Sequence, residues 1–268
     1  MIGILAVLTS LLAAWMSGTP LSEPRSEVAA APLGGRIVVV GGFLSSGANS
    51  RRVDAYDPVR DAWTRLPDLP VSVDHAAAAS VRGRLVVVGG YGADRQPLPR
   101  QRLAGPCGSS AGGRETGSRP RCSRSICERC AGGPREHLAA TALGGKVYAL
   151  GGRLAGYDSN FATVEAYDPG TNRWRRLPDL PTPRGGTGAA AIAGRIVSVG
   201  GESPQGTERS VWALRPSARR WVRLPDLPTP RHGLGVVAVG GRVWVVAGGP
   251  EPGLTVSGAV ESLPVARS

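Results

Sequence analysis

The chain has 268 residues, so its length permits one large domain or two small ones. Glycine and proline account for 39 and 23 residues, and because both interrupt helices this composition excludes a mostly helical fold. The glycines occur in pairs instead of at every third position, which excludes collagen. The formal net charge is +12, which makes nucleic-acid binding a function to test against the positions of the charges.

Residues 1–14 are apolar and uncharged, and they are fewer than the roughly 20 residues that a membrane-spanning helix needs. They resemble the apolar core of a secretory signal, although no Lys or Arg precedes them and Ala14 ends a poor cleavage site. We therefore expect no membrane span. The segment is either a signal, which would make the protein secreted or periplasmic, or an apolar leader or misassigned start on a cytoplasmic protein.

A four-part pattern recurs along the rest of the chain. Each unit contains a run of small residues such as 76–79, a β-branched run ending in paired glycines, a run ending in Tyr-Asp-Pro and a Trp-led run ending in Leu-Pro. The first glycines of the five pairs are spaced 48, 62, 49 and 48 residues apart, at Gly41, Gly89, Gly151, Gly200 and Gly248. Four short strands in about 48 residues match the size of one β-propeller blade. We expect the small residues on the innermost strand, and the Trp and Tyr residues in the packing between blades.

This order of Gly-Gly, Tyr-Asp, Trp and Leu-Pro resembles the kelch repeat over residues 15–263. The resemblance implies an all-β fold over residues 15–268, a single kelch-type β-propeller similar to the central domain of galactose oxidase. Two units depart from the pattern. Ser125 stands where a Trp is due in one, and Leu214-Arg215-Pro216 replaces Tyr-Asp-Pro in the other.

The spacing also predicts how the ring of blades closes. Trp15 lies 26 residues before Gly41, and the later Trp residues precede their next glycine pair by 26 or 27, so the chain begins with an outermost strand. The last match to the pattern, at residues 258–263, is a third strand with no Trp-led strand after it. We therefore expect the N-terminal strand to complete the last blade, giving five blades of four antiparallel strands without an open edge. A truncated gene is the alternative.

Residues 96–134 interrupt the pattern, with seven Arg, all four cysteines and +5 of the net charge. A zinc site is one interpretation, although only Cys127 and Cys130 among the four have the usual close spacing; the other two are Cys107 and Cys122. A disulfide-stapled loop in an exported protein is the second. We favour the third, an aberrant or disordered insertion or a stretch of a GC-rich gene read in the wrong frame.

The charge outside this segment argues against a nucleic-acid partner. The remaining +7 is spread as single arginines, with no basic stripe interleaved with aromatic residues. Single-stranded nucleic acid is usually bound by such a stripe. We therefore expect no nucleic-acid binding.

Candidate site residues lie in the loops that lead from the outer strand of one unit to the inner strand of the next. In a propeller these loops gather at one mouth of the central channel. The predicted ligand-binding residues are Arg25, Glu27, Asp74, His75, Arg135, Glu136, His137, Arg184, Arg231 and His232. Arginines suit an anionic ligand, and Glu27, His75 and His137 suit acid or base roles.

A structural role for these arginines is the alternative, because they recur at one position of the repeat. Each would then pair with an acid of a neighbouring blade, such as Asp68, Asp179 or Asp226. The three histidines could also bind a metal. We nevertheless expect no metal and no cofactor.

Function follows from the resemblance and not from a catalytic motif, since none is present. Kelch propellers are used mainly for binding, which favours a monomeric, non-catalytic module with a protein partner or an acidic small molecule at the channel mouth. The alternative is an exported carbohydrate-active propeller that resembles the bacterial sialic-acid mutarotases and binds an acidic sugar. No catalytic residue of those enzymes or of galactose oxidase can be placed on this chain, so the catalytic residues of such an enzyme are unknown.

Overall fold

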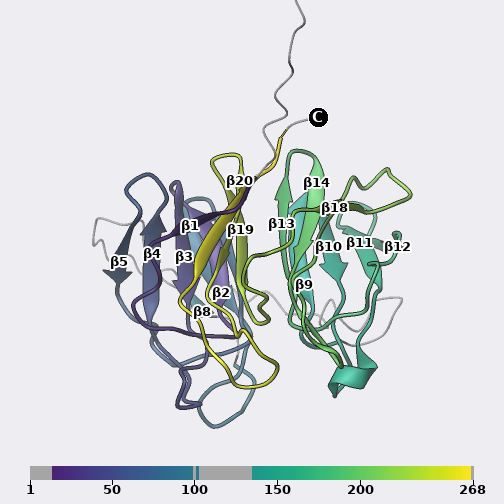
Figure 1. The fold of residues 1–268 in the computed structure, drawn as a ribbon. Coiled ribbons are helices and arrows are strands. Elements are labelled where there is room, and N and C mark those ends of the chain that lie inside the picture. The colour runs from purple at the N-terminus through teal and green to yellow at the C-terminus, as the bar shows by residue number, and fades with distance from the viewer. Residues whose placement is uncertain (1–13, 99–100, 103–134, 267–268) are drawn as a thin grey trace, which may run out of the picture.

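The computed structural model describes residues 14–98, 101–102 and 135–266, and these form an all-β propeller (Figure 1). The predicted all-β propeller fold is therefore confirmed. The described part contains one short 3-10 helix, η2 (Tyr157–Ser159), and no α-helix. In Figure 1 the strands stand roughly upright, with short turns at one end and longer loops at the other.

Each Gly-Gly unit forms one antiparallel sheet, whose strands follow one another from the innermost outward. The first sheet contains β2 (Ala29–Leu33), β3 (Arg36–Val40), β4 (Val53–Asp57) and β5 (Ala62–Leu66). The second contains β6 (Ala77–Val81), β7 (Arg84–Val88) and β8 (Gln101–Arg102). The third contains β9 (Ala139–Leu143), β10 (Lys146–Leu150), β11 (Val164–Asp168) and β12 (Arg173–Arg176).

The last two units complete the arrangement. The fourth sheet contains β13 (Gly188–Ile192), β14 (Arg195–Val199), β17 (Val211–Leu214) and β18 (Val222–Leu224), and a ribbon of β15 (Glu202–Ser203) and β16 (Gly206–Thr207) extends from it. The fifth contains β19 (Gly235–Val239), β20 (Arg242–Val246), β21 (Val260–Pro264) and β1 (Met16–Gly18).

The N-terminal strand closes the last sheet, as its position in the repeat predicts. Strand β1 pairs antiparallel with β21, with Met16 opposite Ser262 and Gly18 opposite Val260. The two ends of the described chain therefore share one sheet. This pairing covers the edge of β21 that would otherwise expose unpaired backbone groups.

The innermost strands pack closely because they carry small residues. Strand β2 lies between β6 and β19, and β13 lies between β19 and β9. A Cβ added to Gly188 would lie 2.2 Å from Cγ2 of Val236, and one added to Gly235 would lie 2.7 Å from Cβ of Ala30. Larger side chains at these glycines would push neighbouring blades apart, which confirms the predicted place of the small-residue runs.

The hydrophobic core lies between facing sheets. The fourth and fifth sheets bury Val197 and Val199 against Val243 and Val245. Apolar clusters also join the first sheet to the second and to the fifth, and the third sheet to the fourth. Alternation along each strand sends one set of side chains to each face, so both faces of the first, fourth and fifth sheets join a core, whereas the second and third sheets each join one. Burial on both faces explains why the strands read as nearly continuous Val and Ile runs.

The tryptophans link neighbouring blades, as expected. The indole N–H of Trp63 donates to the carbonyl of Thr19 (2.8 Å), and that of Trp221 donates to the carbonyl of Pro178 (3.0 Å). Trp15 donates in the same way to Pro225 (2.9 Å). Each acceptor lies four residues after the equivalent Trp position of the preceding unit. One side chain therefore joins two blades at the same place in three of the units.

The fifth glycine pair is offset from the sequence alignment by one residue. In the other units both glycines have positive φ, for example +63° at Gly41 and +96° at Gly42. In the last unit these conformations belong to Ala247 (+57°) and Gly248 (+96°), and Gly249 occupies the next position. The pair predicted at Gly248 and Gly249 is thus shifted back by one residue.

Part of the sequence lies outside the described residues. This includes most of the apolar leader and residues 103–134 with all four cysteines, so the zinc, disulfide and wrong-frame interpretations stay predictions. Before that gap the repeat continues, since Tyr91 bridges Pro97 and Gln101–Arg102 pairs with β7 where a third strand belongs. Within the described ranges, no helix is long and apolar enough to cross a bilayer.

Candidate functional site

Five equivalent residues form a ring at the end of the channel where the longer loops lie. They all have left-handed backbone conformations, with φ between +50° and +60°, and they are Glu27, His75, His137, Gly186 and Gly233. Backbone hydrogen bonds connect most neighbours. His75 donates to the carbonyl of Glu27 (3.1 Å), Gly186 to that of His137 (2.8 Å) and Gly233 to that of Gly186 (2.9 Å).

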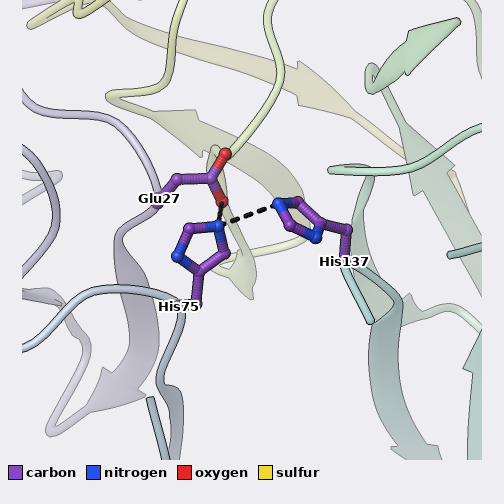
Figure 2. A group of neighbouring side chains, drawn as sticks. All are labelled: Glu27, His75 and His137. Atoms are coloured by element: carbon purple, nitrogen blue, oxygen red, sulfur yellow. Dashed lines mark hydrogen bonds and ion pairs between the residues drawn. The ribbon is translucent and has the colours of Figure 1, made fainter. Parts of the chain in front are cut away.

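Side chains replace the backbone link between two members of this ring. Within the described part of the chain, no backbone hydrogen bond joins His75 to His137. Their side chains meet instead, with the two Nε2 atoms 2.9 Å apart. The two rings meet edge to face, with centroids 4.5 Å apart. Figure 2 shows Glu27, His75 and His137 directed toward one another.

Glu27 is the acceptor at the centre of this cluster. Its Oε2 lies 3.3 Å from Nε2 of His75, and its Oε1 lies 3.2 Å from Nδ1 of His232. The Nδ1 of His75 is bonded to the buried carboxylate of Asp74, which also accepts from Nδ2 of Asn49 (2.6 Å). All three histidines of the chain are thus oriented around one carboxylate.

Protonation in the cluster follows from burial and these contacts. Burial alone would raise the pKa of Glu27, but the hydrogen bond from His232 and the nearby histidine charges lower it to about 2. Burial lowers the pKa of His137 to about 4, and the attraction of Glu27 only partly offsets this. At neutral pH, Glu27 is therefore ionised and His137 is neutral.

The pKa values of the other two histidines, His75 and His232, are raised. Burial lowers the pKa of His75, but the hydrogen bond to Asp74 and the charge of Glu27 outweigh burial and raise it. Burial likewise opposes the charged form of His232, and its hydrogen bond with Glu27 reverses the effect, so its pKa is also raised. The cluster therefore holds histidines with opposite pKa shifts within hydrogen-bonding distance.

A central cavity of about 580 Å³ opens beside the cluster. Its walls are the small residues of the innermost strands, and its polar lining includes Glu27, His75, Glu136 and His137. The cavity is large enough for a small ligand or an inserted side chain. The polar groups of the ring therefore face an accessible space.

The four arginines expected at the channel mouth are buried within their own sheets. Nη1 of Arg231 donates to the carbonyls of Ala247 (2.9 Å) and Ala259 (2.8 Å), and its Nη2 lies 2.5 Å from Oε2 of Glu261. The same contacts recur for Arg25 with Asp54 and for Arg135 with Glu165, while Arg184 uses the hydroxyl of Ser210. The arginines therefore join the loop to the second and third strands of each blade.

This is a structural role, although the partners differ from those expected. The acids Asp68, Asp179 and Asp226 pair instead with exposed arginines three residues before them on the surface. The structure thus gathers Glu27, Asp74, His75, Glu136, His137 and His232 at the mouth and directs the guanidinium groups of Arg25, Arg135, Arg184 and Arg231 into the blades.

Two further charged residues of the mouth were not among the sequence candidates. Arg153 and Glu202 directly follow glycine pairs, and Nη1 of Arg153 lies 2.7 Å from Oε1 of Glu202. Glu202 in turn lies 3.6 Å from Nδ1 of His232. Their position in the repeat could have identified them from sequence. The residue after a glycine pair forms a β-bridge with the second residue of a candidate loop, as Arg153 does with Glu136 and Glu202 does with Gly185.

The fold, the repeat contacts and the loop mouth together define a kelch-repeat β-propeller. The chain belongs to the kelch family, since the kelch motif model matches residues 24–70, 134–181 and 183–228. Among curated proteins it is similar to Kelch-like protein 35 of Mus musculus, with 27% identity over 196 residues, 73% of this chain and 22% of that protein.

Two other relatives match shorter regions more closely. Kelch-like ECH-associated protein 1B of Danio rerio is 41% identical over 70 residues, 25% of this chain and 12% of that protein. F-box/kelch-repeat protein At1g16250 of Arabidopsis thaliana is 43% identical over 51 residues, 19% of this chain and 13% of that protein. The matched regions span less than a quarter of the length of each of these relatives.

Proposed function

We propose that the protein is a non-catalytic binding module that holds a protein partner on the loop face around the channel mouth. The observation that carries this proposal is a group of exposed large apolar side chains on the loops between second and third strands. They are Tyr91 (38% exposed), Leu154 (59%), Tyr157 (37%) and Leu254 (53%). Exposed aromatic and aliphatic groups collected on one face are typical of protein interfaces.

These loops come from different blades but approach one another. A Cβ added to Gly47 would lie 3.2 Å from Cδ2 of Leu254, and one added to Gly253 would lie 3.9 Å from Oη of Tyr157. The guanidinium of Arg153 stacks over the ring of Tyr157, with Cζ 4.8 Å from its centroid. The apolar groups and the charged mouth thus form one continuous surface, which supports a partner that covers several loops together.

The family relationship also supports a protein partner. One relative carries an association with ECH in its name, Kelch-like ECH-associated protein 1B. The acidic-sugar alternative has less support, because the four arginines that would bind the acid donate to groups of their own blades. Monomeric state and a small-molecule ligand stay predictions.

The test compares two faces of the propeller by affinity capture and quantitative mass spectrometry. Leu154→Asp and Leu254→Asp should each reduce capture of the same specific partner by at least tenfold, since a charge in the apolar contact is costly. The matched control is Val59→Asp, because Val59 is 94% exposed and lies in the turn between β4 and β5 on the opposite face. Val59→Asp should leave capture unchanged.

Two results would contradict this proposal. Equal loss in the Val59→Asp control would show that the loop face is not the binding surface. A thermal shift with N-acetylneuraminic acid that survives Leu154→Asp but disappears in Glu27→Gln would favour the acidic-sugar alternative.

A further inference from the structure

We propose that Glu27, His75 and His137 form a binding site for a divalent transition metal, with zinc as the best-matched ion. One donor atom from each of these residues can be chosen so that all three lie within 4.8 Å of one another. This inference is independent of the protein partner proposed above. It departs from the expectation of no metal that the sequence suggested.

Two of the three donor separations are close to those of a metal site. Nε2 of His75 lies 2.9 Å from Nε2 of His137 and 3.3 Å from Oε2 of Glu27. Zinc bonds of about 2.0–2.1 Å in a tetrahedral site place neighbouring donors about 3.3 Å apart. The third pair, Glu27 and His137, also lies within 4.8 Å, so the three donors in Figure 2 are close enough to share one ion after side-chain movement.

The orientation of His75 is that of a metal ligand. Its Nδ1 is hydrogen-bonded to the fully buried carboxylate of Asp74, which holds a proton on Nδ1 and leaves Nε2, on the side of Glu27 and His137, as the nitrogen that a metal would take on loss of its own proton. Asp74 is itself fixed by Asn49. A carboxylate that orients a histidine in this way is a common outer-layer contact of zinc-binding histidines.

The other two donors have supporting groups as well. One oxygen of Glu27 is held by His232, which leaves the second oxygen, Oε2, on the side of His75. Nδ1 of His137 is buried without a hydrogen-bond partner and lies 3.5 Å from Oε1 of Glu136. A metal on Nε2 would increase the acidity of the Nδ1–H group and favour closure of this contact to a hydrogen bond.

Backbone conformation gives independent support for a functional role of these three residues. Glu27, His75 and His137 hold the left-handed conformation at φ of +50° to +52°, where glycine fills the two remaining equivalent positions. A non-glycine residue in this region costs roughly 1 kcal/mol or more. The side chains that bear this cost are the same three that converge on one point.

The adjacent cavity determines what kind of site this is. Three protein donors leave a fourth position facing the space of about 580 Å³. Water, a small anion or a donor side chain of a bound protein could complete the coordination. Two histidines and one carboxylate with an open position suit zinc and neighbouring first-row ions better than calcium or magnesium, which prefer oxygen donors.

The cysteines at positions 107, 122, 127 and 130 could bind zinc independently, so the experiment uses a background in which all four are serine. Zinc binding to this EDTA-treated protein is measured by calorimetry and by metal content after gel filtration. We expect one zinc per chain. His75→Asn and His137→Asn should each weaken zinc binding by at least 100-fold, and asparagine tolerates the left-handed backbone at both positions.

Four further measurements separate a metal site from a structural cluster. Asp74→Asn should weaken zinc binding by 10- to 100-fold, as expected for a group that orients a ligand. Asp158→Asn, on the exposed η2 helix, should leave binding unchanged. Cobalt should give visible d–d bands without the thiolate charge-transfer band, and zinc should raise the unfolding temperature.

Other outcomes would overturn the proposal. Zinc binding that is lost in the serine background would assign the metal to the cysteines. Binding that is unchanged in a folded His75→Asn/His137→Asn double variant would show that the cluster is only a hydrogen-bond network. Circular dichroism of each variant establishes that it is folded before the comparison.

Discussion

The Nε2 atoms of His75 and His137 lie 2.9 Å apart although 62 residues separate them in the chain. The two residues occupy equivalent positions in consecutive Gly-Gly units, on either side of the long interval in the repeat. This side-chain contact takes the place of the backbone hydrogen bond that joins other neighbouring residues of the ring. The side-chain cluster thus links the two blades that flank residues 103–134.

The lowered pKa of His137 predicts a loss of stability in mild acid. The unfolded chain binds a proton at this histidine near pH 6.5, whereas the folded chain resists protonation until about pH 4. Lowering the pH from 6.5 to 4.5 should therefore reduce the free energy of unfolding by about 2 kcal/mol through this residue. The folded-state pKa values of His75 and His232 are raised, so their contribution to stability is retained, not lost, as the pH falls below 6.5.

Urea unfolding at several pH values in EDTA checks this prediction. The wild-type protein should lose stability over this pH range, and His137→Asn should remove most of the loss. Glu27 titrates in the unfolded chain near pH 4.5, so the comparison stops there. An identical slope in His137→Asn would mean that another group causes the acid sensitivity.

The indole contacts between blades predict a difference between two tryptophans. Trp221→Phe removes the N–H donor to the carbonyl of Pro178 and should cost about 1 kcal/mol. Trp212 is the matched control, because its buried Nε1 has no hydrogen-bond partner. Trp212→Phe should therefore be neutral or slightly stabilising in the same thermal unfolding measurement. Equal costs for the two substitutions would show that ring packing, and not the hydrogen bond, matters at Trp221.

The close approach of two innermost strands predicts a size-dependent defect. Gly188→Ala places a methyl group 2.2 Å from Cγ2 of Val236 and should destabilise the junction of β13 and β19 by about 1–3 kcal/mol. Truncation of the facing side chain should relieve the clash. The double variant Gly188→Ala/Val236→Ala should thus be less destabilised than the sum of the single variants, as measured in a double-mutant cycle. Strict additivity would mean that the destabilisation by Gly188→Ala does not arise from contact with Val236.

Buried and exposed arginines should differ strongly in their contribution to stability. Arg231 is fully buried and bonded to Glu261, so Arg231→Met leaves a buried carboxylate unpaired and should cost about 3–5 kcal/mol. Arg223 forms an exposed pair with Asp226, and Arg223→Met should cost less than about 1 kcal/mol. Chemical denaturation measures both. A small effect at Arg231 would mean that the blade does not depend on this ion pair.

Much of the fold could be predicted from sequence because the repeat is a local pattern. The glycine pairs and the Trp-led phrases recur at nearly constant spacing, and each described unit places its strands in the same order. Counting units also predicted that β1 would complete the last sheet. The exception was the fifth pair, where Ala247 adopts the left-handed conformation usually left to glycine. Composition cannot reveal that shift, since a neighbouring Gly-Gly satisfies the motif equally well.

The candidate site was predictable only in part. Spacing correctly placed Glu27, His75 and His137 at equivalent loop positions, but equivalence does not say which side chains touch. The arginines show the difference, because Arg25 and Arg231 have long side chains that could have reached either the channel or their own blade. Their burial beside Asp54 and Glu261 depends on where the second and third strands place carbonyl and carboxylate groups.

The sequence alone therefore determined the repeated unit, the family it resembles, the order of its strands and the closure by β1. These follow from local hydrophobic pattern, turn residues and counting. The tertiary structure decided that the arginines are internal to the blades and that two histidines and one glutamate from three units converge on one point. Such convergence depends on the angle between blades and on side-chain rotamers, which distances along the chain do not encode.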